Sequence, residues 1–256
     1  MPRLSNRTAA MQESPIRKLV PLADAAKERG VHVYHLNIGQ PDIETPKEML
    51  AAVKNLPKKV IHYCHSQGEP SYLASLVEYY RSHKIYVDAS QINVTTGGSE
   101  AIVFAFMIAL NPGDEVIIPE PFYTNYNGFA SMAGVTIKPL TTKGEDGFHL
   151  PAKEEIEAKV GPKTKAILLC NPNNPTGTVY TPEELNAVAE ICKKNDLWLL
   201  TDEVYREFVY QCGEYISALN IEGMEDRVIV MDSISKRYSA CGARVGCLVS
   251  KNREVM

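Results

Sequence analysis

The sequence lacks an apolar run long enough to cross a membrane. A bilayer-spanning helix needs about 20 apolar residues, whereas the longest run here, Ala101–Leu110, is typical of a buried helix. There is no basic excess either, with 27 Lys and Arg against 31 Asp and Glu. Because nucleic-acid-binding proteins usually carry a basic patch, we expect neither a nucleic-acid nor a membrane partner. The N-terminus has no apolar signal segment, which favours a cytoplasmic protein.

Metal-binding and disulfide patterns are also missing. The six cysteines form no C-x-x-C pair, and the histidines show no zinc-like spacing. We therefore expect no bound metal and interpret the cysteines as reduced thiols of a cytosolic protein. The composition, 45% hydrophobic and 23% charged, is that of a globular protein with a large core.

From about residue 46 onward, short apolar runs alternate with segments of helical period. The runs predict seven strands: Gln91–Thr95, Glu115–Pro119, Thr136–Leu140, Ala166–Cys170, Leu197–Thr201, Val228–Asp232 and Gly246–Ser250. The helical segments are Ser71–His83, Ser99–Leu110, Tyr123–Ala133, Lys153–Val160 and Pro182–Asn195, and a further helix has Pro46 at its first position. This alternation predicts a three-layer α/β/α fold with a mainly parallel, seven-stranded sheet.

Residues 1–45 show a different pattern and predict an N-terminal arm with part of a small second domain. A helical pattern opens at Ser14 and continues to Lys27, before Gly30. The segment 31–39 (VHVYHLNIG) is strand-like. Residues 46–256 then form the predicted large domain.

Polar segments directly follow four of the predicted strands. They are Gly97–Glu100, Asn171–Gly177, Asp202–Tyr205 and Ser233–Lys236. In sheets of this kind ligands bind at the carboxyl ends of the strands. The sequence therefore predicts a binding site where these segments converge.

Taken singly, the segments have structural explanations as well. The glycines before Ser99 can open an anion-binding helix N-terminus or a plain strand–helix turn, and Asn171–Gly177 can simply hold a turn. Asp202 fits either a helix cap or a partner for a buried cation. These alternatives stay open on the residues alone.

The string Ser233–Lys236 fits two chemistries. The S-x-x-K pair of penicillin-binding proteins also requires S-D-N and K-T-G, and neither string occurs. The other chemistry is a lysine that forms a Schiff base with a carbonyl compound. Arg244, just before the last predicted strand, could then anchor a phosphate. For a lone lysine, an exposed surface charge is the ordinary role.

Together the motifs resemble the class I/II aminotransferases, which depend on pyridoxal 5′-phosphate (PLP) and have fold type I, and among them the bacterial aspartate-type enzymes. The resemblance runs over nearly the whole chain. It rests on LNIGQPD at 36–42, YCHSQGEPSYLASL at 63–76, TTGGSEA at 95–101, PFYTNY at 121–126, NPNNPTG at 171–177, TDEVYREF at 201–208 and SISKRYSACGARVG at 233–246.

The resemblance implies roles for the motif residues. Lys236 would form the Schiff base with PLP and move a proton during catalysis, and Asp202 would pair with the pyridine nitrogen. Tyr205 and Asn174 would contact the ring oxygen, and Tyr123 would stack on the ring. The phosphate would be held by Gly98, Ser99, Glu100, Ser233, Ser235 and Arg244.

The same resemblance implies a substrate pocket and a partner subunit. Gly39 and Asn174 would line the pocket, and Tyr63 would reach the phosphate bound by the other subunit of a homodimer with shared active sites. The implied reaction moves an amino group from an amino acid, aspartate as first candidate, to a 2-oxo acid. A PLP-dependent C–S β-lyase and a non-enzymatic PLP-sensing domain remain alternatives.

The family also uses a C-terminal small domain, whose arginine binds the substrate carboxylate. That domain has no counterpart before Met256. We therefore expect a fragment of a longer protein, inactive by itself.

Overall fold

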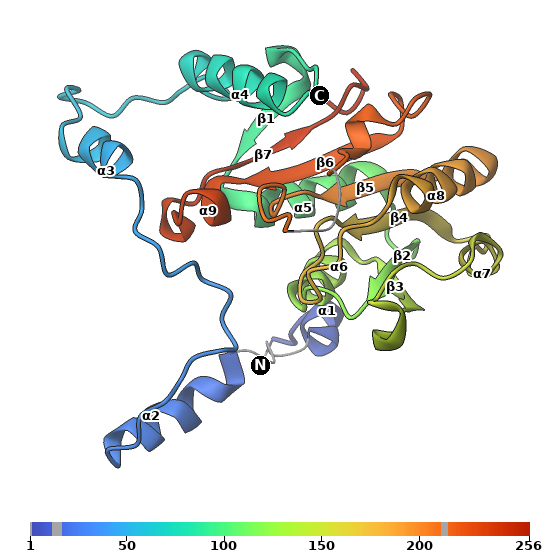
Figure 1. The fold of residues 1–256 in the computed structure, drawn as a ribbon, viewed down its shortest axis with the longest axis horizontal. Helices are drawn as coiled ribbons and strands as arrows, with labels where there is room; N and C mark the ends of the chain where they lie inside the picture. Colours follow the sequence, from blue (N-terminus) through green and yellow to red (C-terminus); the bar gives the residue numbers. More distant parts are fainter. Residues whose placement is uncertain (1, 12–16, 211–214) are drawn as a thin grey trace.

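The computed structural model describes residues 2–11, 17–210 and 215–256 (Figure 1). Within them, seven strands form one sheet in the order β1-β7-β6-β5-β4-β2-β3. Their bounds are β1 Ile92–Thr95, β2 Glu115–Glu120, β3 Thr136–Thr141, β4 Thr164–Cys170, β5 Trp198–Asp202, β6 Val228–Ser233 and β7 Gly246–Val249. All seven predicted strands are therefore confirmed, each within two residues of its expected bounds.

One strand runs against the others. β7 is antiparallel to both of its neighbours, β1 and β6, while the remaining neighbours pair in parallel. The predicted mainly parallel sheet is thus confirmed. Because of its direction, β7 begins where β1 and β6 end, and Gly246 pairs with both Thr95 and Ser233.

Most α-helices of the described residues fall close to predicted segments, whereas the short helices at residues 6–10 and 234–237 were not predicted. They are α1 Asn6–Ala10, α2 Val20–Glu28, α3 Lys47–Lys54, α4 Pro70–Ser82, α5 Gly97–Ala109, α6 Asn125–Ala133, α7 Lys153–Glu157, α8 Pro182–Asn195 and α9 Ile234–Arg237. The bounds of α8 match the prediction because Thr181 and Glu184 form a reciprocal capping box at its start. Across the described ranges, no helix is both long and apolar enough to span a bilayer.

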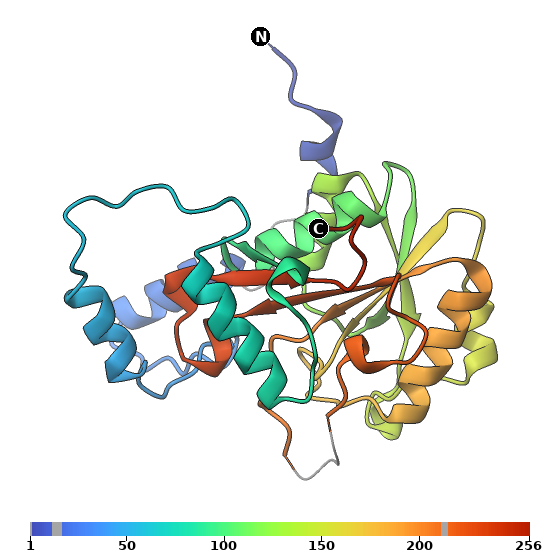
Figure 2. The ribbon, with the colours of Figure 1, turned by 90° about the horizontal axis from the view of Figure 1, so that it is seen from above.

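The sheet lies between two helical layers, as predicted (Figures 1 and 2). Helices α5 and α6 share one apolar cluster with β4 residues Ala166 and Leu168. Helices α4, α7 and α8 share the other cluster with Ile167 and Leu169. Since alternate residues of β4 enter opposite cores, the strand reads as one continuous apolar run.

The N-terminal part departs from the sequence prediction. Segment 31–39 is not a strand; its side chains, among them Tyr34 and Leu36, are largely exposed. A strand needs a neighbouring strand for its hydrogen bonds, and none of the described strands pairs with this segment. The predicted start of the first helix, at Ser14, lies outside the described residues. The end of that helix is as predicted, because α2 ends at Glu28, shortly before Gly30.

Two helix ends also differ from their predicted positions. Pro46 directly precedes α3 instead of occupying its first turn. Helix α7 stops at Glu157, a few residues before Val160, because turn-type hydrogen bonds at Lys159 and Val160 replace the α-helical pattern. The proposed boundary between residues 45 and 46 stays a prediction.

Candidate functional site

Five neighbouring strands bring the predicted site residues to one edge of the sheet (Figure 1). Asp202 and Ser233 are the last residues of β5 and β6, and Asn174 follows β4 in the next loop. Gly97, after β1, starts α5, and Arg244 lies just before β7. The antiparallel direction of β7 is what places Arg244 at this edge.

A glycine-lined corner joins α5 to the sheet. A Cβ at Gly246 would lie 2.5 Å from the Gly97 carbonyl carbon and 2.6 Å from the Gly98 nitrogen, so only glycine permits this approach. The guanidinium of Arg244 lies against the same turn, because a Cβ on Gly97 would be 2.4 Å from its Nη2 atom. A helix N-terminus and a guanidinium thus meet, which is the chemistry of an anion site.

Two buried serines lie beside this corner. The hydroxyl oxygens of Ser233 and Ser235 are 2.7 Å apart, and Ser233 Oγ accepts a hydrogen bond from the Ser235 nitrogen at 3.1 Å. Ser233 Cβ also lies 3.4 Å from the position that a Cβ on Gly98 would occupy. The hydroxyls, the helix N-terminus and Arg244 are suited to the phosphate of PLP.

The first turn of α5 leaves its backbone available to a ligand. The side chain of Glu100 turns back and accepts a hydrogen bond from the Thr96 nitrogen at 2.6 Å. It therefore contributes to the helix start, and only its backbone N–H, like that of Ser99, is suited to an anion.

Lys236 is partly buried in α9, one strand away from Asp202. Its Nζ donates to the carbonyl oxygen of Gly39 at 2.7 Å and lies 4.0 Å from Cys241 Sγ. Gly39, predicted to line the substrate pocket, is therefore in direct contact with the predicted Schiff-base lysine. A second tie, from Thr45 Oγ1 to the Ser239 carbonyl at 2.7 Å, holds the same N-terminal segment nearby.

Asp202 is a buried carboxylate. Its Oδ2 accepts a hydrogen bond from Tyr126 Oη at 2.8 Å and its Oδ1 accepts one from the Val204 nitrogen at 3.3 Å. Burial raises the pKa of Asp202 to about 6, although these hydrogen bonds oppose the shift. A positive charge brought to this carboxylate, such as a protonated pyridine nitrogen, would stabilise its ionised form.

Two of the residues predicted to contact the cofactor ring lie side by side. Asn174 Nδ2 donates to Tyr205 Oη at 3.4 Å, as expected for two residues that share one ring oxygen. Burial raises the pKa of the Tyr123 hydroxyl, and the nearby Asp202 carboxylate raises it further. The Tyr123 ring packs against the ring of Tyr126, whose hydroxyl donates to Asp202, and there it could cover a ring.

Tyr63 is not part of this cluster within one chain, since its side chain is fully exposed. Conversely, the sequence prediction missed Tyr126, the hydrogen-bond donor to Asp202. Its position at the end of the PFYTNY motif, three residues after Tyr123, was the available signal. Tyr123 lies two residues before α6 and Tyr126 in its first turn, and their rings pack edge to face with centroids 5.4 Å apart.

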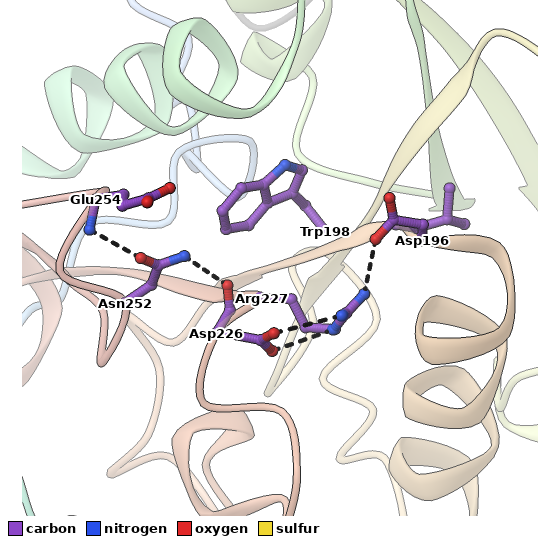
Figure 3. A pocket seen from close by; sticks show the side chains of 7 residues that line it. Asp196, Trp198, Asp226, Arg227, Asn252 and Glu254 are labelled. Carbon is purple, nitrogen blue, oxygen red and sulfur yellow. Dashed lines mark hydrogen bonds and ion pairs between the residues drawn. The ribbon is translucent and has the colours of Figure 1, made fainter.

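The five described cysteines are free thiols, and Cys212 lies outside the described residues. A cavity of about 460 Å³ lies at the opposite edge of the sheet (Figure 3). Its lining includes Trp198 at the start of β5 and Arg227 before β6, and none of the predicted cofactor residues. Ion pairs and hydrogen bonds among its charged rim residues fix its shape.

Comparison with known proteins decides the family. The model of aminotransferase class I and II matches residues 31–256. This chain belongs to the class I and II aminotransferase family. An arginine–pyruvate transaminase of Pseudomonas aeruginosa is 35% identical over 227 residues, covering 88% of this chain and 57% of that protein. An aspartate aminotransferase of Streptomyces avermitilis is 34% identical over 251 residues, covering 96% and 61%.

Solved aminotransferase structures share the fold. The aspartate aminotransferase of Thermus thermophilus with maleate superposes with a TM-score of 0.91 at 31% identity, covering all of this chain and 66% of that one. The alanine aminotransferase of Pyrococcus furiosus gives 0.89 at 32%, covering 99% and 66%. The predicted fold type I of the family is thereby confirmed. The chain spans about three fifths of the length of the curated relatives.

The raised pKa of Asp202 makes a prediction for stability. Between about pH 4 and pH 6 the folded state holds a proton on Asp202 that the unfolded state has lost. The free energy of unfolding of the PLP-free protein should therefore fall with rising pH, by up to about 3 kcal/mol from this residue. Asp202→Asn should remove this component, as measured by urea unfolding across the pH range.

Asp146→Asn, at an exposed position, is the matched control and should retain the wild-type pH dependence. A wild-type protein and an Asp202→Asn variant whose stabilities run parallel from pH 4 to pH 7 would contradict the assignment of a raised pKa.

Proposed function

We propose that this chain is part of a PLP-dependent aminotransferase that moves an amino group from an amino acid to a 2-oxo acid. One juxtaposition carries the proposal. Lys236, in the helix that follows β6, and the buried Asp202 carboxylate, at the end of β5, come from neighbouring strand ends, and the Arg244 corner lies one strand further along. An amine, a buried acid and an anion site are the three groups that PLP requires. Membership of the aminotransferase family supports the same conclusion.

Each residue would do one task. Arg244, the two serines and the α5 N-terminus would bind the phosphate, and Tyr123 would lie over the ring. Asp202 would hold a proton on the ring nitrogen, kept in place by the Tyr126 hydrogen bond. Asn174 and Tyr205 would orient the ring oxygen. When bound, PLP supplies an electron sink for the negative charge that develops on the substrate Cα.

Lys236 would be the base and acid of the reaction. Its Nζ would take the proton from the substrate Cα and then donate it to the cofactor. The Gly39 carbonyl, 2.7 Å from Nζ, places the N-terminal segment over this atom, where a substrate carboxylate could contact the Gly39 backbone. Aspartate is the first candidate substrate, because several relatives are named aspartate aminotransferases.

We also propose a homodimer in which each subunit completes the other's site. Tyr63 and the apolar side chains of Leu36, Val53 and Ile61 are exposed on the N-terminal segment. Such apolar exposure is typical of a surface that a partner covers. Tyr63 of one subunit would then reach the phosphate bound by the other.

The reaction class is tested with the full-length protein. Mixed with PLP, aspartate and 2-oxoglutarate, it should form glutamate at a rate that Lys236→Ala lowers at least about a hundredfold, because the acid–base group is lost. Amino-acid turnover is followed by coupled spectrophotometric assay. Formation of pyruvate and ammonia from a cysteine conjugate without any 2-oxo acid would point to a β-lyase instead.

Shared sites are tested by mixing inactive subunits. Tyr63→Ala should impair the partner's site, and Lys236→Ala should inactivate its own. A refolded mixture of the two variants should be more active than either alone, because one of the two sites in each mixed dimer has both Tyr63 and Lys236. A mixture no more active than the sum of its parents would exclude shared sites.

A further inference from the structure

A buried network of charges lies directly beneath the candidate site. Its members are Glu203, Arg206, Asp232 and Arg237. Each is the immediate sequence neighbour of a predicted cofactor residue, in turn Asp202, Tyr205, Ser233 and Lys236. At each of these positions, one residue is a predicted cofactor contact and its neighbour in the chain belongs to the buried charge network.

Asp232 is the centre of the network and is fully buried. Its Oδ2 accepts hydrogen bonds from Tyr80 Oη at 2.8 Å and from Arg206 Nη1 at 3.0 Å. Its Oδ1 accepts one from the Ser233 nitrogen at 2.7 Å and forms an ion pair with Arg237. Burial alone would raise the pKa of Asp232, but the two guanidiniums hold it at about 2.

Arg237 binds the backbone carbonyl group of the same residue, Ser233. Its Nη2 and Nε donate to the carbonyl oxygen of Ser233 at 3.1 Å and 3.3 Å. The guanidinium carbon lies 4.2 Å from the centre of the Tyr79 ring, and the side chain is only 4% exposed. Through Asp232 and Arg237, therefore, both the N–H and the carbonyl group of Ser233 are held.

Ser233 is the residue from which α9 starts. Its side chain caps the helix by accepting from the Ser235 nitrogen, and Lys236 follows one residue later. A helix of four residues has little stability of its own. Its position therefore depends on contacts made from outside the helix, and those of Asp232 and Arg237 with the capping residue Ser233 are among them.

The other two members of the network, Glu203 and Arg206, connect Asp232 to the end of β5. Arg206 Nη2 donates to Glu203 Oε2 at 2.9 Å, and Glu203 Oε1 accepts from the Ala218 nitrogen at 2.9 Å. Glu203 directly follows Asp202 in the chain. The ends of β5 and β6 are thereby linked through charges as well as through the sheet.

Stability alone does not account for such a network. Removing charges from water costs about as much as their attraction returns, so apolar side chains of the same volume often stabilise a core equally well. What a guanidinium adds is direction, since its planar donors can reach a carboxylate and a carbonyl at once. Arg237 uses that geometry on Asp232 and Ser233.

We propose that Arg237 is a positioning residue for the cofactor site, which fixes Ser233 and, through α9, the orientation of Lys236. The inference rests on the proposed function, because it assigns Arg237 a role toward bound PLP. Arg237 itself acts through Ser233, not on the cofactor.

The test uses the full-length protein with Arg237→Gln and Arg237→Lys. The Lys variant keeps the charge beside Asp232 but cannot reach the Ser233 carbonyl with a second donor. It should therefore unfold at nearly the wild-type temperature, yet bind PLP about tenfold more weakly, as for the loss of a hydrogen bond from a charged group. The Gln variant should show at least the same loss of PLP affinity.

Two readouts separate positioning from general damage. PLP affinity is measured by absorbance titration, and the pH midpoint of the bound cofactor's visible band reports the surroundings of Lys236. Both should change in the Arg237 variants. Arg227→Gln is the control: Arg227 pairs with Asp226 and Asp196 at the opposite end of β6, and its loss should leave both readouts unchanged.

Wild-type affinity and an unshifted midpoint in both Arg237 variants would overturn the inference and leave the proposed function intact. A change in Arg237→Gln that Arg237→Lys fully restores would also overturn it, because charge alone would then suffice. Failure of the wild-type protein itself to bind PLP would instead overturn the proposed function.

Discussion

The site depends on how charge is balanced on two buried carboxylates at the ends of neighbouring strands, Asp202 on β5 and Asp232 on β6. Burial raises the pKa of Asp202 to about 6, whereas Arg206 and Arg237 hold that of Asp232 at about 2. Asp232 is therefore ionised and holds the backbone in place. A positive charge on a ligand would stabilise the ionised form of Asp202 more than that of Asp232, which already has two arginine partners. Two acids whose surroundings separate their pKa values in this way can take different roles.

The direction of β7 supplies the other requirement. Because this strand runs against its neighbours, Arg244 enters the edge at which β1 and β6 end. Because Gly246 has no side chain, the first turn of α5 packs directly against the sheet. Backbone atoms of Gly97 and Gly98 lie within 2.6 Å of the position that a Cβ on Gly246 would occupy. The corner that we propose as the phosphate site thus combines segments that are about 150 residues apart in the chain, at one end of the same sheet that positions Asp202.

Much of this could be predicted from the sequence. The strands were found because both faces of the sheet are covered, so that each reads as an apolar run, and α8 because its capping box is local. The reversal of β7 could not be predicted, since strand direction depends on pairing. Segment 31–39 alternates like a strand, but no strand in the described part of the chain pairs with it. Tyr126 was missed because its partner Asp202 is distant in sequence. Arg237 was missed because a charged residue in a motif is ordinarily solvated, and the sequence does not show that this one is buried.

The central claim is that Lys236 carries PLP, and covalent trapping tests it most directly. The full-length protein is incubated with PLP, reduced with borohydride to make the lysine–cofactor bond permanent, and digested for mass spectrometry. The account predicts one pyridoxyl group per chain, on the peptide that contains Lys236, at PLP concentrations that leave the other lysines unmodified. A label at another lysine, or protein that binds PLP without any label on Lys236, would contradict it.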